Sequence, residues 1–296
     1  MSAPLLGPDD LRRVSDLALV ARWVVEGTIT GLHRSPHHGF SIEFAEYREY
    51  VPGDDLRYFD WKVLGRSDRR TIKKFHSETN LHAHIVVDSS ASMGYGDPTK
   101  FHYARCLAAA IAYVLEGQKD GVGLTLVDDG VRLRLPPAVG PTQLRRIFGA
   151  LEEAAPASKT SLAAALDDIA GALGRRGLVA IISDLHDDEV ALQSAVRHLR
   201  FAGHEVIVFH VLDPSELRID VDRPVEFEDL ETGERLQVHG ATIRDAYERR
   251  VREWIDALRA GIEGSRADYR LVETTEPFAA VLSDYLHGRR ARGAGP

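Results

Sequence analysis

The sequence predicts an α/β fold with a doubly wound, mainly parallel sheet. From Leu81 onward, short runs rich in Val, Ile and Leu alternate with segments whose apolar residues recur at helical spacing. Such alternation is typical of parallel strands joined by helices that cover both faces of the sheet. The residues Asp128-Asp129-Gly130 separate two strand-like runs and indicate a hairpin. One strand is therefore expected at an antiparallel edge.

The elements of this region follow one another without an internal repeat. Strands are expected over residues 81–87, 122–127, 131–135, 178–183, 205–211 and 268–272. Helices are expected over residues 99–116, 142–153, 161–173, 188–201, 243–262 and 277–286. The segment at about 213–239 contains Thr232-Gly233, typical of a turn, and predicts an inserted hairpin. Residues 81–287 are expected to form one domain, and 288–296 a disordered tail.

Residues 1–80 are expected to form an N-terminal extension with a helix and a β-rich segment. Apolar residues recur at helical spacing over 8–26, and strand-like alternation covers 69–79. Between them lies a dense block of acids, arginines and aromatics, residues 43–61. We interpret this block as a network that braces the extension, because Trp61 would be costly to leave in water. A contact surface for a partner is the alternative.

The overall composition excludes several classes of protein. A net charge of −8 over 296 residues argues against general affinity for nucleic acid or anionic lipid. The single cysteine, Cys106, excludes an internal disulfide and lies on a predicted helix, where we expect a buried packing residue. No apolar run approaches the ~20 residues of a membrane-spanning helix. We therefore expect a cytoplasmic protein without membrane insertion.

The first candidate site follows the strand over 81–87. Asp88, Ser90 and Ser92 alternate directly after this apolar run, at the strand end where open α/β sheets bind ligands. A carboxylate and two hydroxyls are hard oxygen donors that suit Mg²⁺ or Mn²⁺ better than Zn²⁺. A polar strand end followed by a serine-rich turn is the structural alternative.

Two later segments point to the same edge of the sheet. Asp184 follows the apolar run Ile181-Ile182, again at the carboxyl end of a predicted strand. Thr160 and Ser161 stand at a predicted helix start, where a hydroxyl can cap the helix or reach a ligand. Asp88 and Asp184 are expected on neighbouring strands on either side of the sheet's switch point. The three segments together predict a metal site more strongly than any one alone.

This combination resembles two known groups of proteins. Asp88-x-Ser90-x-Ser92, Thr160 and Asp184 resemble the metal-ion-dependent adhesion site of von Willebrand factor A domains. The region upstream resembles a bacterial family catalogued as domain of unknown function 58. The residues that carry this second resemblance are Gly39-Phe40, Glu43-Phe44, Glu46-Tyr47-Arg48, Tyr50, Pro52-Gly53-Asp54-Asp55, Arg57 and Asp60-Trp61.

The resemblances imply a von Willebrand factor A-like domain that is not an enzyme and binds an acidic side chain of a protein client through a metal ion. The implied metal ligands are Asp88, Ser90, Ser92, Thr160 and Asp184. Lys159 stands where a glycine often precedes the threonine, so Ser161 is the alternative to Thr160. The family is associated with MoxR-type AAA+ ATPases. Such an ATPase is the implied partner, in chaperone-like complex assembly or metal insertion.

Two catalytic alternatives compete with this hypothesis. Asp184-Leu185-His186 matches the D-x-H of metal-dependent phosphoesterases, which need an Asn-His pair and further histidines. Gly203-His204-Glu205 lacks the asparagine. Phosphoryl transfer through Asp88 would need a second carboxylate two residues later, where Ser90 stands.

Two binding alternatives are also open. His82 with His84, or His37 with His38, would make only half of a zinc site. The basic residues between Arg66 and Lys74 could contact phosphate, although a solvated strand edge is the simpler interpretation.

Overall fold

The computed structural model describes residues 17–32, 47–49, 64–65, 71–73, 81–157, 159–174, 176–219, 224–228, 235–278 and 280–282. Contacts divide the chain into two units, Met1–Leu32 with Leu81–Pro296, and His33–Asn80. In the second unit, strands β1 (Tyr47–Glu49) and β2 (Thr71–Lys73) pair antiparallel. Most of the dense block 43–61, including Trp61, lies outside the described residues, as do His37 and His38.

The larger unit is built on a six-stranded sheet with the strand order β10-β7-β6-β3-β4-β5. All neighbouring strands are parallel except β4 and β5, which confirms the predicted fold class and the antiparallel edge. The strands are β3 (His82–Asp88), β4 (Gly121–Val127), β5 (Val131–Ala138), β6 (Gly177–Ser183), β7 (Glu205–Leu212) and β10 (Asp268–Glu273).

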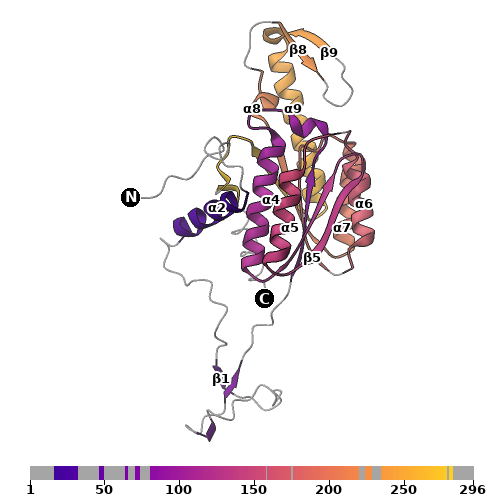
Figure 1. The fold of residues 1–296 in the computed structure, drawn as a ribbon. Helices are drawn as coiled ribbons and strands as arrows, with labels where there is room; N and C mark the ends of the chain where they lie inside the picture. Colours follow the sequence, from indigo (N-terminus) through magenta and orange to yellow (C-terminus); the bar gives the residue numbers. More distant parts are fainter. Residues whose placement is uncertain are drawn as a thin grey trace. The chain divides into compact units, whose positions relative to one another are not determined.

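Helices cover both faces of this sheet (Figure 1). One face packs against α4 (Lys100–Gly117) and α5 (Pro141–Glu153), and α2 (Leu17–Leu32) packs on these two helices. The other face packs against α6 (Leu162–Ala172), α7 (Glu189–Phe201) and α9 (Gly240–Gly264). Successive residues of a strand pack into opposite cores, so Ile85 and Val87 of β3 lie in the core on one face of the sheet and Val86 lies in the core on the other. Both cores are therefore apolar, as a parallel sheet requires.

The first helix belongs with the larger unit and extends further than its sequence predicted. The expected helix ended at residue 26, whereas α2 ends at Leu32; residues 8–16 lie outside the described part of the chain. Val20, Ala21 and Val24 of α2 are buried against the main core. The Leu17 amide donates a hydrogen bond to Oε1 of Glu152 at 3.1 Å, which fixes the helix start on α5.

The inserted segment contains a short helix and a hairpin. Helix α8 (Pro214–Leu217) follows β7 directly, and strands β8 (Pro224–Glu228) and β9 (Arg235–His239) pair antiparallel before α9. Among the described residues, no helix has both the length and the apolar composition needed to cross a bilayer.

The register of the sheet sets the position of the candidate site. Strand β3 lies between β4 and β6, with Val87 opposite Ile182 and Asp88 opposite Val127. The chain leaves β3 for β4 on one side and returns to β6 on the other, so β3 and β6 flank the switch point. Asp88 and Ser183 thus end neighbouring parallel strands.

Candidate functional site

Asp88 lies at the centre of the polar cluster and is almost completely buried. Its Oδ1 accepts a hydrogen bond from the Ser90 amide at 2.9 Å, and its Oδ2 accepts one from the Ser183 hydroxyl at 2.6 Å. The Ser183 hydroxyl also accepts from the Leu185 amide at 2.9 Å, so it joins the ends of β3 and β6. These bonds fix the carboxylate and turn the chain into the 3₁₀ helix η2 (Ala91–Gly94).

Of the serine hydroxyls that follow Asp88, that of Ser89 is structural, and those of Ser90 and Ser92 lie at the site. Ser89 donates to the backbone oxygen of Val127 at 2.9 Å and is part of the sheet edge. Ser90 and Ser92 bring their Oγ atoms to 3.1 Å from one another. The spacing of two residues therefore places both hydroxyls on one side of the chain, with Ser90 at the Asp88 carboxylate and Ser92 hydrogen-bonded to the Asp184 carboxylate.

Asp184 is also fully buried and interacts with the same cluster. Its Oδ2 accepts a hydrogen bond from Nζ of Lys100 at 2.7 Å. The same ammonium lies 2.6 Å from Oε1 of Glu216 on α8. Lys100 itself is completely buried. The site thus contains a cation supplied by the chain, which the sequence interpretation did not include.

Burial and neighbouring charges move the pKa values of these groups in opposite directions. Burial, reinforced by the charge of Asp184, raises the pKa of Asp88 above its ordinary value, although hydrogen bonds from Ser183 and Ser90 act against it. Burial also favours the neutral form of Asp184, but the Lys100 ammonium outweighs it and lowers that pKa. Burial acts to lower the pKa of Lys100, yet Asp184 and Glu216 raise it. Lys100 and Asp184 therefore form a charged pair.

Thr160 and Ser161 lie on a segment that is tied to the same sheet edge. The Ala157 amide donates to the Ser89 oxygen at 2.9 Å, and the Ser161 amide donates to the Asp128 oxygen at 2.7 Å. Thr160 and Ser161 are both half-buried and lie just before α6. Their roles as metal ligands stay predictions.

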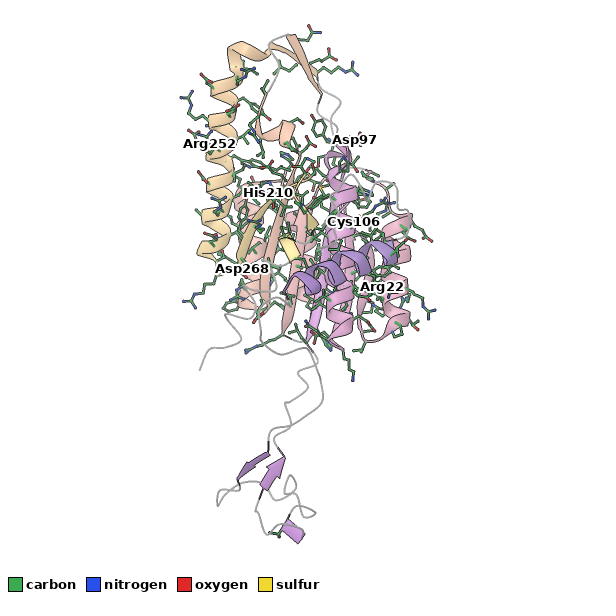
Figure 2. The ribbon with its side chains drawn as sticks, turned by 90° about the vertical axis from the view of Figure 1, so that its left-hand side faces the viewer. Arg22, Asp97, Cys106, His210, Arg252 and Asp268 are labelled. Atoms are coloured by element: carbon green, nitrogen blue, oxygen red, sulfur yellow. The ribbon has the colours of Figure 1, made fainter. Side chains whose placement is uncertain are left out.

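Aromatic side chains line the cluster beyond Asp184. His186 is exposed and stacks on Trp254, with ring centroids 5.1 Å apart, and its Nε2 lies 3.9 Å from Oε1 of Glu216. Trp254 meets the edge of His210, which is labelled in Figure 2. Burial lowers the pKa of His210 to about 3, so this imidazole is neutral at physiological pH. Its Nδ1 lies 2.6 Å from the Tyr269 hydroxyl.

The other candidate residues lie apart from this cluster. His84 is buried with its Nε2 2.6 Å from the Thr125 hydroxyl, as expected for a core histidine. Cys106 is buried on α4 (Figure 2), and burial raises the pKa of its thiol to about 12. Within the described ranges, no three His, Cys, Asp or Glu side chains are placed to hold a metal ion. A metal at the Asp88 cluster would therefore depend on the serine hydroxyls.

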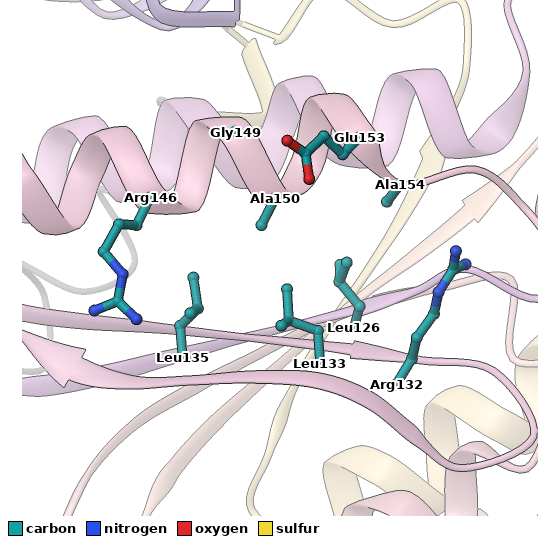
Figure 3. A pocket seen from close by; sticks show the side chains of 9 residues that line it. All are labelled: Leu126, Arg132, Leu133, Leu135, Arg146, Gly149, Ala150, Glu153 and Ala154. Atoms are coloured by element: carbon teal, nitrogen blue, oxygen red, sulfur yellow. The ribbon is translucent and has the colours of Figure 1, made fainter.

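A separate hollow of about 560 Å³ lies between α5 and the edge strand β5 (Figure 3). Its floor is apolar, and Arg132 and Arg146 stand at its ends, but Arg132 already donates to the Ala155 oxygen at 2.8 Å. The lining residues are Leu126, Arg132, Leu133, Leu135, Arg146, Gly149, Ala150, Glu153 and Ala154. None of the predicted ligands belongs to it.

The sequence contained signals for the residues that were missed. Lys100 is the first residue of α4, where the helix dipole disfavours a cation unless an acid compensates it. Asp213 and Glu216 form a capping box around α8, which marks a helix start inside the segment that was expected to be an inserted hairpin. What these local signals could not supply is the pairing of Lys100 with acids that lie 84 and 116 residues further along.

Comparisons with known proteins agree with this architecture. An uncharacterized protein of Mycobacterium tuberculosis is 29% identical over 288 residues, which cover 94% of this chain and 89% of that protein. An aerotolerance-related membrane protein from Bacteroides fragilis has a similar structure, with a TM-score of 0.51 and 16% identity over 70% of this chain and 97% of that one. The von Willebrand factor A domain of SpRpn10 is also similar, with a TM-score of 0.41 and 12% identity over 68% of this chain and 93% of that one. Residues 46–255 match the family described as protein of unknown function DUF58, so the chain belongs to that family, as its upstream residues predicted.

Proposed function

We propose that this protein is an interaction module that uses a divalent cation to bind an acidic side chain of a partner protein. The observation that carries the proposal is the convergence of Asp88, Ser90, Ser92 and buried Asp184 at the switch point of the sheet. The broader half of the proposal, that the protein is an interaction module, agrees with its von Willebrand factor A-like fold.

The donor atoms fit Mg²⁺ or Mn²⁺. Asp88, Ser90 and Ser92 would be the direct ligands, Asp184 would act directly or through water, and Thr160 or Ser161 would join when a partner is bound. A bound ion would supply a point of positive charge with an open coordination position. The chain's own part is to hold the hydroxyls 3.1 Å apart and to fix the Asp88 carboxylate through Ser183.

The proposed partner is a MoxR-type AAA+ ATPase, and the client a protein that offers Asp or Glu to the site. Resemblance to the family supports this pairing, and the chemistry of the site agrees with it, because a metal with an open position prefers a carboxylate oxygen. Together, the ATPase and this module would assemble protein complexes or insert metal ions into the client.

Binding accounts for the site better than hydrolysis. His186, the residue that a phosphoesterase would need, is stacked on Trp254 and faces Glu216. Gly203-His204-Glu205 also lacks the asparagine of the Asn-His pair that such an enzyme needs. We therefore propose a module without catalytic activity.

The test is an affinity pull-down from a lysate of the source cells, with Mg²⁺ or with EDTA, followed by identification of the recovered proteins. Asp88→Ala removes the central carboxylate, and Asp168→Ala changes an exposed acid of α6 as the matched control. An AAA+ ATPase recovered only with Mg²⁺, and lost in Asp88→Ala but not in Asp168→Ala, is the expected result. Recovery that is indifferent to EDTA and to Asp88→Ala would contradict the proposal.

A further inference from the structure

The ammonium of Lys100 is enclosed between two carboxylates that come from different parts of the chain. Nζ lies 2.7 Å from Oδ2 of Asp184 and 2.6 Å from Oε1 of Glu216, and only 1% of the lysine side chain is exposed. The ring of Tyr95 lies over it, with its centroid 5.9 Å from Nζ. A lysine so placed is a fixed part of the cluster, unlike an exposed lysine whose flexible chain keeps its charge in water.

We propose that Lys100 is the resident cation of this site and that it restrains divalent ion binding by holding Asp184. This inference rests on the ligand set of the proposed function and adds the residue that regulates it. An ion that recruits Asp184 has to displace the ammonium or bind beside it. Either event has a cost, because one breaks a buried ion pair and the other brings two positive charges together.

The hydrogen bonds of the two aspartates support this assignment. Both oxygens of Asp88 already accept hydrogen bonds, from the Ser90 amide and the Ser183 hydroxyl. Asp184 gives its Oδ2 to Lys100, its carboxylate also accepts a hydrogen bond from the Ser92 hydroxyl, and its Oδ1 has a long contact of 3.4 Å from the His186 amide. Both acids are therefore hydrogen-bonded, and Asp184 is the one whose charge Lys100 already neutralises.

Glu216 extends the effect of Lys100 to the inserted segment. Its Oε2 accepts the amide of Asp213 at 2.8 Å, and its backbone oxygen accepts the Tyr247 hydroxyl of α9 at 2.8 Å. Lys100 therefore connects the metal-binding candidates to α8 and to the first half of α9. If an ion displaces the ammonium from Asp184, the lysine keeps Glu216 as its partner, so the site can change occupancy without leaving a buried charge unpaired.

The experiment compares Mn²⁺ binding to the full chain by isothermal titration calorimetry in Lys100→Met and in the wild type. Methionine keeps the length of the side chain and removes its charge. We expect Lys100→Met to bind Mn²⁺ at least about tenfold more tightly, because it removes a unit positive charge that would repel the ion. Lys119→Met, which changes an exposed lysine beyond the end of α4, should bind like the wild type. Equal or weaker binding to Lys100→Met overturns the proposal.

Two further variants keep the result interpretable. If circular dichroism shows that Lys100→Met is unfolded, the double variant Lys100→Met with Glu216→Gln is used, because it also removes the charge of one of the two acids that lose their cation. We expect this double variant to show the same gain in Mn²⁺ affinity over the wild type. Wild-type affinity would again overturn the proposal. Asp88→Ala in the Lys100→Met background should abolish the gain. If Asp88→Ala removes binding from the wild type but Lys100→Met binds no more tightly, the role of Lys100 fails and the ligand set survives. If Asp88→Ala leaves all binding intact, both fail.

Discussion

Lys100 Nζ and Asp184 Oδ2 lie 2.7 Å apart, and both side chains are removed from solvent. The pair joins the first residue of α4 to the end of β6, so it fixes the helix that follows β3 against the strand beside it. A buried pair of this kind adds little net stability over a well-packed apolar pair, but losing one member is costly because the other charge stays buried. The site is thus also a point on which the fold depends.

Lys100→Met should destabilise the protein in metal-free buffer. Removal of the ammonium leaves Asp184 without its cation, and we expect the free energy of unfolding to fall by about 3 kcal/mol. Urea unfolding measured in EDTA gives this value. Lys119→Met should change it by less than about 0.5 kcal/mol, because an exposed lysine contributes little. A stability equal to the wild type would show that the pair is not formed in solution.

Asp88→Asn should have the opposite effect on the metal-free protein. The raised pKa of Asp88 means that the fold disfavours its ionised form, through burial and the nearby charge of Asp184. Asparagine keeps the size and removes the charge, so the free energy of unfolding near neutral pH should rise by about 1 kcal/mol. The same change should abolish any stabilisation by Mg²⁺, whereas Asp168→Asn should alter neither quantity. A loss of stability in Asp88→Asn would identify Asp88 as a mainly structural residue.

The Ser183 hydroxyl should contribute stability that its sequence position does not suggest. It donates to Asp88 and accepts from the amide of Leu185, a buried residue with a φ of 56°. Ser183→Ala leaves that amide without a partner, so we expect a loss of about 1–3 kcal/mol in denaturant unfolding. Ser265→Ala, which removes a half-buried hydroxyl at the end of α9, is the control and should cost less. Equal losses in the two variants would argue against a special role for Ser183.

The fold could be predicted from the sequence because its signals are local. Runs such as 205–211 have the length and β-branching of buried strands, and Asp128-Asp129-Gly130 marks the antiparallel pair of the six-stranded sheet. The aspartates at the ends of β3 and β6 could also be predicted, since parallel strands end at one edge. Lys100 and Glu216 could not, because their pairing depends on the position of α8 over that edge, which no periodicity encodes.

The buried imidazoles should make the protein less stable in acid. Burial is the main cause that lowers the pKa of His84 from 6.5 to about 4, with Arg134 adding to it. As the pH falls, His84 therefore takes up a proton in the unfolded chain before it does so in the folded protein. Its contribution to the free energy of unfolding is fully present above pH 6.5 and declines by roughly 3 kcal/mol as the pH falls towards 4. His84→Gln should flatten the slope of unfolding free energy against pH, although His210 will leave part of it. An unchanged slope in His84→Gln would contradict the assignment.

Glu216→Gln should loosen α8 and leave the sheet intact. The substitution removes the charge that faces Lys100 but retains an oxygen for the Asp213 amide, so the cap survives while the tie to the site weakens. Hydrogen exchange should become faster over residues 213–219 and at the start of α9, which the Tyr247 hydroxyl joins to Glu216, and stay unchanged in β3 and β6. Glu276→Gln is the matched control: Glu276 also accepts a backbone amide three residues earlier and pairs with a cation, but its partner Arg270 is 40% exposed. Because an exposed pair is screened by water, that control should change exchange only near its own turn. Equal exchange over 213–219 in Glu216→Gln and the wild type would mean that Lys100 does not hold α8 to the site.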